Sequence, residues 1–300
     1  MPIYYHYNPS NDLVNEDRQL LEMLDSQQFD GVFLSDVFAS KEDKRVHLAI
    51  DRANQLKLKT GILIDCFQGK DQYHSEYFTR PMNFKGAIYL PTTDYYPICP
   101  NNPVAIRHLL EKIESVNKHY QPDYIYLNHF QFPFNWEEEN LDIQDQTPQY
   151  CYCPFCITEF SSVIGEIVTS SAQIEEVMPE WLEWRTDAIS KLLGTVKRVI
   201  PKKTALIVGL PPLAVIDLPF ATGLLPYSIV EEGCFISPML YHKKVSNKIM
   251  WIEDILDQYK IDLNQRKIMP YFQIQNRQER AFLEKLENRF GGLIVADSLP

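Results

Sequence analysis

Short apolar runs alternate with amphipathic stretches along the whole chain. Eight runs have the length and composition of buried strands, and they cover 3–5, 31–36, 60–67, 123–130, 205–210, 235–241, 268–274 and 292–297. Between most of them, apolar residues recur at helical spacing, over 12–28, 42–58, 103–119, 154–168, 174–200, 247–259 and 278–290. Asn102 precedes Pro103 and is the expected cap of the third of these helices. Eight short strands separated by helices over 300 residues predict an α/β fold, the (β/α)8 TIM barrel.

The glycine pattern argues against the main alternative, a doubly wound open sheet. That fold usually begins with a glycine-rich turn, and the 11 glycines of this chain form neither GxGxxG nor GxxxxGK[ST]. We therefore predict one TIM-barrel domain over residues 1–300, with about 131–175 as an insertion after the fourth strand and an extra extended piece over 87–90. The eighth strand ends at Asp297, so the sequence predicts no clear final helix. A contact within a homo-oligomer is one way to cover that gap.

Composition and charge indicate which kinds of molecule the protein is expected to bind. Asp and Glu outnumber Lys and Arg by 40 to 29, which gives a formal net charge of −11, and an acidic surface repels the phosphate backbone of nucleic acids. No apolar run approaches the roughly 20 residues that span a bilayer, and residues 1–12 lack the pattern of a secretory signal. We therefore expect a cytoplasmic protein with no nucleic acid or membrane partner. Aromatic residues make up 12% of the chain and suit a cleft for a carbohydrate or another hydroxylated small molecule.

Three of the six cysteines lie within six residues, as Cys151, Cys153 and Cys156 in the segment after the fourth strand. A tight knuckle of this kind supplies three of the four ligands of a tetrahedral zinc ion. We expect Cys99 to supply the fourth, because it ends the loop after the neighbouring third strand. Four sulfur ligands leave no open position, so the predicted Zn²⁺ is structural. A disulfide and a chance cluster are the alternatives, and a reducing cytoplasm and the very short loops disfavour the disulfide.

This cysteine arrangement on a predicted barrel resembles that of the glycoside hydrolase family 42 β-galactosidases, and a looser set of glycosidase barrels is similar. The matching pieces are Cys99–Pro103, Leu127–Phe130, Cys151–Cys156 with Phe160, Trp184-Arg185 and Ser237–His242. The resemblance implies a TIM barrel with a structural zinc that hydrolyses a glycoside. In that family the acid/base glutamate follows an asparagine at the end of the fourth strand, and the nucleophile ends the seventh. Here Asn128 is followed by His129, and the seventh strand ends in Gln273-Ile274-Gln275, so neither expected carboxylate is present.

Other polar residues at the predicted carboxyl ends of strands are candidates for catalysis, because barrel enzymes carry their active sites there. These candidates are Asp36, Asp65, His129 and Asp297. Asp36 and Asp65 leave adjacent strands and could divide acid and base roles, whereas capping a following helix is the competing role for each aspartate. His129 is an acid/base candidate because the ordinary pKa of histidine lies near neutrality.

Candidates for substrate binding lie beside these residues, and they are Asn128, Trp136, Tyr241, His242 and Gln273. The leading hypothesis is a glycoside hydrolase that acts through carboxylates at the C-terminal face of the barrel. The alternative is a catalytically inactive saccharide-binding barrel, which the missing glutamates at the fourth and seventh strands favour. A metal-dependent hydrolase is a third hypothesis, although the sequence contains neither HxH nor HExxH.

Overall fold

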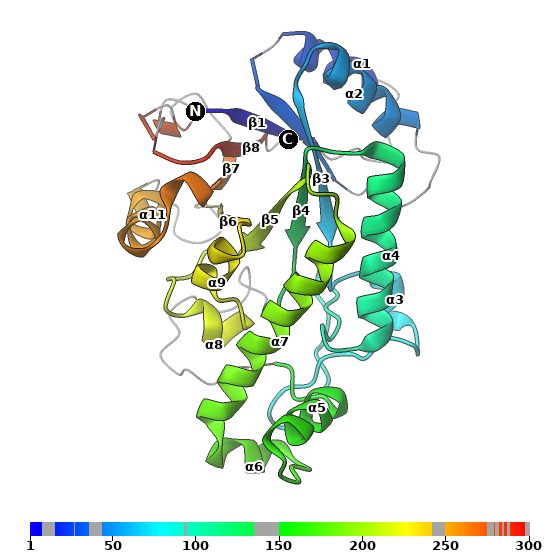
Figure 1. The fold of residues 1–300 in the computed structure, drawn as a ribbon, viewed down its shortest axis with the longest axis vertical. Coiled ribbons are helices and arrows are strands. Elements are labelled where there is room, and N and C mark those ends of the chain that lie inside the picture. The colour runs from blue at the N-terminus through cyan, green and yellow to red at the C-terminus, as the bar shows by residue number, and fades with distance from the viewer. Residues whose placement is uncertain are drawn as a thin grey trace.

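The strands close into a barrel in which every neighbouring pair is parallel and β8 returns to pair with β1 (Figure 1). The strands are β1 (Ile3–Tyr7), β2 (Gly31–Leu34), β3 (Lys59–Asp65), β4 (Tyr124–Asn128), β5 (Ala205–Leu210), β6 (Phe235–Leu240), β7 (Tyr271–Ile274) and β8 (Leu293–Asp297). This computed structural model describes residues 1–7, 16–26, 28–35, 44–92, 95–134, 150–241, 250–274, 279, 282–283, 285–286 and 289–297. The predicted (β/α)8 barrel is confirmed.

Helices connect the strands and cover the outside of the barrel (Figure 1). They are α1 (Glu16–Asp25), α2 (Lys44–Gln55), α3 (Lys70–His74), α4 (Pro103–Tyr120), α5 (Pro154–Ile164), α6 (Ser171–Glu176), α7 (Met178–Val199), α8 (Leu218–Thr222), α9 (Pro226–Glu231), α11 (Met250–Asp262) and the short 3-10 helix η1 (Gln265–Lys267). Part of the helix predicted over 278–290 lies outside the described residues, and residues 279, 282–283 and 285 are helical. Among the helices that are described, none is both long enough and apolar enough to cross a membrane.

Several stretches differ from the predicted elements, among them α3 (Lys70–His74), where the sequence predicts no helix. The single helix predicted over 174–200 is two helices, α6 and α7, because Pro179 has no N–H for a helical hydrogen bond and its ring clashes with a preceding turn. The extended piece predicted over 87–90 is not a strand, since Ile88 forms only an isolated bridge with Met82. The short helices α8 and α9 lie between the fifth and sixth strands, where the sequence predicts none.

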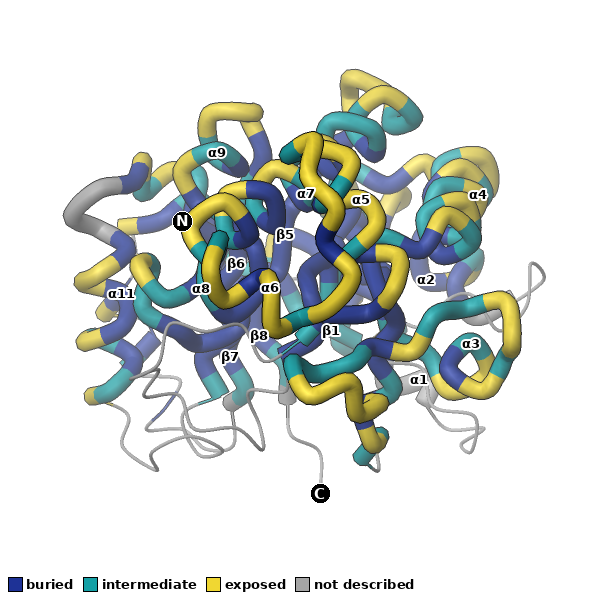
Figure 2. Tube along the Cα trace, turned by 90° about the horizontal axis from the view of Figure 1, so that it is seen from below, coloured by how far each residue is buried: buried dark blue, intermediate teal, exposed yellow. Residues whose placement is uncertain are grey.

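The core has two layers, one inside the barrel and one between the barrel and the helices. Side chains alternate between them, as in β4, where Tyr124 and Tyr126 face the interior and Ile125 and Leu127 face the helices. Gly209 leaves room for the Tyr126 ring, which a Cβ at this position would approach to 2.8 Å. The buried interior residues are Tyr4, Phe33, Leu63, Tyr126, Ile207, Met239, Met269, Tyr271 and Ile294. Figure 2 shows the same pattern from below, with buried strands inside and exposed residues on the outer sides of the helices.

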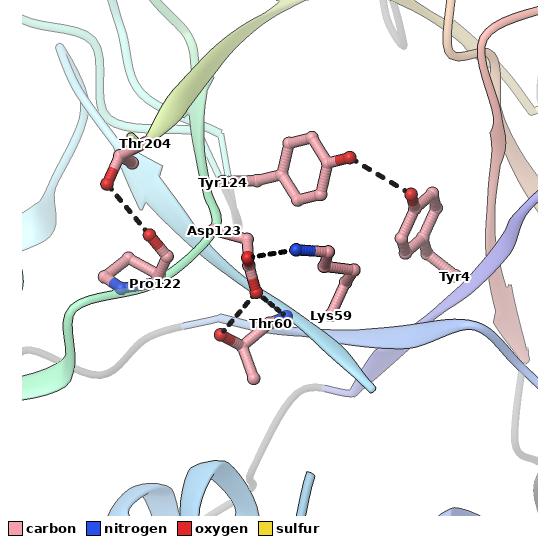
Figure 3. A network of polar contacts seen from close by, with 7 residues as sticks. All are labelled: Tyr4, Lys59, Thr60, Pro122, Asp123, Tyr124 and Thr204. Atoms are coloured by element: carbon pink, nitrogen blue, oxygen red, sulfur yellow. Dashed lines mark hydrogen bonds and ion pairs between the residues drawn. The ribbon is translucent and has the colours of Figure 1, made fainter. Parts of the chain in front are cut away.

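A polar network joins the starting ends of several strands (Figure 3). The carboxylate of Asp123, just before β4, accepts hydrogen bonds from Lys59 Nζ at 2.6 Å and from the backbone N–H of Thr60 at 3.0 Å. The hydroxyls of Tyr4 and Tyr124 lie 3.1 Å apart across the barrel interior. These contacts fix the N-terminal end of the barrel, which in this fold serves stability and leaves the opposite end for function.

Asn102 caps α4, as the sequence predicts. Its side-chain oxygen accepts hydrogen bonds from the backbone N–H groups of Val104 at 2.8 Å and Ala105 at 3.0 Å. Its amide nitrogen donates to Thr79 Oγ1 at 2.8 Å, so the same buried side chain also anchors the long segment between β3 and α4.

We expect Asn102→Ala to lower the free energy of unfolding by about 1–2 kcal/mol, because two helix N–H groups lose their acceptor. Asn102→Asp keeps that acceptor and loses the amide donor to Thr79 Oγ1 and, at 3.4 Å, to the carbonyl of Tyr77, so it should cost less than the alanine variant. Urea unfolding followed by circular dichroism measures both variants. An alanine variant as stable as the parent protein would contradict the capping role.

Candidate functional site

Four cysteines from two distant segments form a buried cluster. The Sγ atoms of Cys99, Cys151, Cys153 and Cys156 all lie within 4.8 Å of one another. Cys99 Sγ lies 3.4 Å from Cys156 Sγ and 3.5 Å from Cys153 Sγ, far beyond the roughly 2.05 Å of a disulfide bond. All six cysteines are described and all are free thiols. The structure therefore brings together the four residues that the sequence predicts as one ligand set.

The cluster fits a tetrahedral metal ion. Sulfur atoms at the usual Zn–S distance of about 2.3 Å from one ion stand roughly 3.8 Å apart, close to the separations found here. All four cysteines are buried, so a bound ion would be shielded from water. Four soft ligands at this spacing make a possible metal site of the closed, structural type.

Backbone contacts hold the two segments of the cluster in place. The backbone N–H of Cys99 donates to the carbonyl of Thr79 at 3.0 Å, and that of Tyr152 donates to the carbonyl of Met82 at 2.8 Å. Cys153 occupies the N-cap position of α5 without a capping hydrogen bond from its side chain, and α5 begins with proline and carries Cys156 in its first turn. The cluster thus joins the segment between β3 and α4 to the start of α5.

The thiols of the cluster differ in how readily they lose a proton. Burial raises the pKa of Cys99 and of Cys156, because a thiolate is poorly solvated there. Hydrogen bonds from Cys151, Cys156 and Cys99 lower the pKa of Cys153. The Cys153 thiol therefore loses its proton more readily than the thiols of Cys99 and Cys156, and a metal ion that binds to the cluster would displace the thiol protons.

A second polar group lies at the opposite end of the barrel from the network of Figure 3, where β3 and β4 end. Asp65 and Asn128 are register partners on these strands, and Asn128 Nδ2 donates a hydrogen bond of 2.6 Å to Asp65 Oδ1. His129 Nε2 lies 4.0 Å from the same oxygen. The side chain of Asp65 is 36% exposed and that of His129 is 21% exposed, so both are accessible from the mouth of the barrel.

The backbone of His129 explains how two consecutive residues face one carboxylate. In an extended strand, successive side chains point to opposite faces. His129 has φ of +51°, in the left-handed region that residues other than glycine rarely adopt. This turn brings its ring back toward Asp65, and the ring packs against that of Tyr95 at 5.2 Å between centroids. Such conformations are often found at functional sites.

Below the mouth lies an uncharged layer of histidine and tyrosine side chains. His6 Nδ1 is hydrogen-bonded to the hydroxyl of Tyr271, whose ring contacts those of Tyr126 and Tyr241. Burial lowers the pKa of His6 to about 4, and the charge of Asp65 opposes this only in part. Burial also raises the pKa of Tyr126 and Tyr271. The floor of the mouth is therefore neutral at pH 7, beneath the carboxylate of Asp65.

The lowered pKa of His6 predicts an acid-dependent loss of stability. Between the folded pKa of about 4 and the ordinary value of 6.5, the unfolded chain binds a proton at His6 that the folded chain does not. The free energy of unfolding should therefore fall as the pH drops from 6.5 to 4, by up to about 1.4 kcal/mol per pH unit from this residue. Urea unfolding across this range should show a shallower slope for His6→Gln. Equal slopes in the two proteins would rule out His6 as a source.

The structure tests the placement of only some predicted site residues. Asp36, Trp136 and His242 lie outside the described residues, and so does the side chain of Asp297, whose backbone ends β8 opposite Ile274. Asp65, Asn128 and His129 form one group, as described above.

Gln273 lies within β7, and Tyr241 directly follows β6, so both are at the same end of the barrel as Asp65. Gln273 is two residues beyond Tyr271 and shares its inward face. Tyr241 packs its ring against Tyr271.

The sequence reasoning missed His6. The predicted first strand stops at residue 5, whereas β1 extends to Tyr7 and carries His6 on the inward face shared with Tyr4. The alternation of Tyr4 and His6 was the available signal.

The chain matches no protein-family model, and no curated protein is similar to it in sequence. Solved structures share its fold. The glycoside hydrolase domain of PgaB (BpsB) from Bordetella bronchiseptica has a TM-score of 0.70 at 10% identity, covering 99% of this chain and 93% of that one. The β-galactosidase of the Antarctic haloarchaeon Halorubrum lacusprofundi has 0.68 at 10% identity, covering 98% and 52%. That of Bacillus circulans sp. alkalophilus has 0.64 at 11% identity, covering 98% and 50%.

These similarities bear on the fold. The chain spans about half of the length of the two β-galactosidases and nearly all of the PgaB domain. At identities of 10–11% they show that the chain has the TIM-barrel fold that these structures share.

Proposed function

We propose that the protein is a glycoside hydrolase whose catalytic carboxylate is Asp65. The observation that carries this proposal is the group of Asp65, Asn128 and His129 at the mouth of a barrel of glycoside hydrolase type. The fold places catalytic groups at this end. The hydrogen bond from Asn128 orients the carboxylate toward the mouth, and His129 is near enough to exchange a proton through one intervening water.

Hydrolysis of a glycoside requires a second carboxyl group across the scissile bond. Asp36 is the proposed partner, because it follows β2, the neighbour of β3 in the barrel. Asp297, at the end of β8, is the other candidate. Asn128, Gln273, Tyr241, Trp136 and His242 are proposed to bind sugar hydroxyls and rings.

The substrate and the metal belong to the same proposal. Two of the similar structures are β-galactosidases, so a β-galactoside is the first substrate to test. Zn²⁺ is the proposed ion of the four-cysteine cluster, where it would supply a cross-link between two segments and take no part in the reaction. We also propose a cytoplasmic location, because the four thiols remain reduced there.

A saccharide-binding barrel without turnover is the second candidate. It is favoured by the residues at the two positions where the resembling family carries its glutamates, which here are His129 and the end of the seventh strand, Gln273-Ile274-Gln275.

One experiment separates the two candidates. The protein is incubated with a panel of nitrophenyl α- and β-glycosides, the β-galactoside included, while calorimetry measures the binding of the corresponding free sugars. Release of nitrophenol from any member supports the hydrolase. Saturable binding without release supports the saccharide-binding protein, and the absence of both contradicts each candidate.

A further inference from the structure

Arg185, in the middle of α7, is a fully buried cation without a described anionic partner. Its Nη2 donates one long hydrogen bond of 3.4 Å to the carbonyl of Ala221, and its guanidinium stacks on the ring of Phe132 at 4.0 Å. Among the described residues, its Nε and Nη1 have no hydrogen-bond partner and no carboxylate forms an ion pair with it. A buried charge is costly unless an opposite charge compensates for it.

The four-cysteine cluster packs on the same face of α7. The ring of Tyr152, between two of the cysteines, stacks on Trp181 with 5.3 Å between centroids and 15° between planes. Phe160 of α5 packs edge-on against Trp181 at 5.0 Å. Trp181 and Arg185 are four residues apart on the helix and therefore lie one above the other. The residues that carry the cluster therefore pack on the face of α7 from which Arg185 also projects.

Electrostatics supports this neighbourhood. Burial lowers the pKa of Arg185 to about 10, and the groups that oppose this are Tyr152 and the thiols of Cys156, Cys151 and Cys99. These groups belong to residue 99 and residues 151–156, so the two segments that form the cluster are the neighbours whose ionisation the guanidinium would favour.

We propose that Arg185 is the counter-charge of the metal-loaded cluster, a positioning residue that favours metal binding without ligating the ion. This inference rests on the proposed Zn²⁺ site. Four thiolates around one divalent ion carry a net charge of two minus, which a buried site must balance with a nearby cation. Four neutral thiols offer no such charge. Arg185 therefore stabilises the metal-loaded protein, whereas in the metal-free protein its uncompensated charge lowers the free energy of unfolding.

The competing role is purely structural. The hydrogen bond to Ala221 and the contact with Phe132 would be lost in any truncated variant, whatever the cluster holds. A structural role predicts the same loss of stability with and without metal, whereas a counter-charge predicts a loss in the loaded form alone.

The experiment uses Arg185→Met, which removes the charge, and Arg185→Lys, which keeps it. Arg198→Met is the matched control, because Arg198 is an arginine on the same helix, about 20 Å further along and on the exposed surface. The Zn²⁺ dissociation constant of each protein is measured at one pH by competition with a chromophoric chelator. The thermal midpoint is measured with and without Zn²⁺.

We expect Arg185→Met to raise the Zn²⁺ dissociation constant about 10- to 100-fold. Arg185→Lys should lie between it and the parent protein, and Arg198→Met should match the parent. Without metal, Arg185→Met should melt no lower than the parent. Equal affinity in Arg185→Met and the parent, or an equal drop in midpoint in both states, would overturn the proposal. A parent protein that takes up no Zn²⁺ would refute the zinc site itself, and this inference with it.

Discussion

Asp65→Asn is expected to lower the turnover of a cleaved glycoside by roughly 10²- to 10⁴-fold while the barrel stays folded. The asparagine keeps the size of the side chain and an oxygen for the 2.6 Å hydrogen bond from Asn128, but it cannot exchange a proton or carry the charge. The side chain of Asp65 is about one third exposed, so its replacement should cost little stability. Initial rates on the glycoside that the parent protein cleaves best, together with thermal melting, measure the two effects.

The matched control is Asp187→Asn, which makes the same chemical change on the exposed surface of α7, where Asp187 faces Lys191 at 3.9 Å. It should retain the parent rate, because it lies outside the barrel interior. If Asp65→Asn also retained the parent rate, Asp65 would be excluded as the catalytic carboxylate and the reaction would have to use other groups. A loss of rate accompanied by a large drop in melting temperature would point to a structural effect.

The barrel could be predicted because its signal is local. Strands such as β2, β5 and β6 are buried on both faces, so they appear in the sequence as short apolar runs, and the predicted fifth strand coincides with β5 (Ala205–Leu210). Short helices such as α8 (Leu218–Thr222) carry too few turns for a periodic pattern, and tertiary contacts form them. The division between α6 and α7 did have a local signal, in Pro179, which the periodicity of the apolar residues obscured.

The residues of the cysteine cluster could be predicted from the sequence more fully than the contacts at the mouth of the barrel. Three cysteines of the cluster are close in sequence, and backbone hydrogen bonds of the segment between β3 and α4 hold Cys99 beside them. At the mouth, the sequence paired Asp65 with Asp36, which lies outside the described residues, and the structure brings Asn128 and His129 to the carboxylate of Asp65. That contact depends on the left-handed backbone of His129, which no pattern of residue types reveals.

The environment of Arg185 is a second feature that the sequence alone does not reveal. Arginine is among the residues least often buried, so its position on α7 predicts a solvent-facing side chain or a surface ion pair. Only the structure shows that Arg185 is fully buried, on a helix whose Trp181 packs against Phe160 of α5. A residue whose role depends on a partner assembled from two distant segments cannot be assigned from one segment alone.

The second large effect is expected at Cys99, the one ligand that precedes α4. Its replacement in Cys99→Ser leaves three ligands within residues 151–156 and cuts the link to the segment between β3 and α4. An ion present at a thousand times its dissociation constant contributes about 4 kcal/mol to stability. For a chain of this length, losing it should lower the thermal midpoint by on the order of 10 °C. Elemental analysis should find one Zn²⁺ per parent chain and much less in the variant.

Cys234→Ser is the control, because Cys234 is also a buried free thiol but stands outside the cluster. It should keep its zinc and lose at most the roughly 1–3 kcal/mol that a poorly paired buried hydroxyl costs. A strong chelator should lower the midpoint of the parent protein to that of Cys99→Ser and leave the variant unchanged. This comparison ties the loss to the ion rather than to the serine. A Cys99→Ser protein with full zinc and the parent midpoint would show that the four thiols do not act as one ligand set.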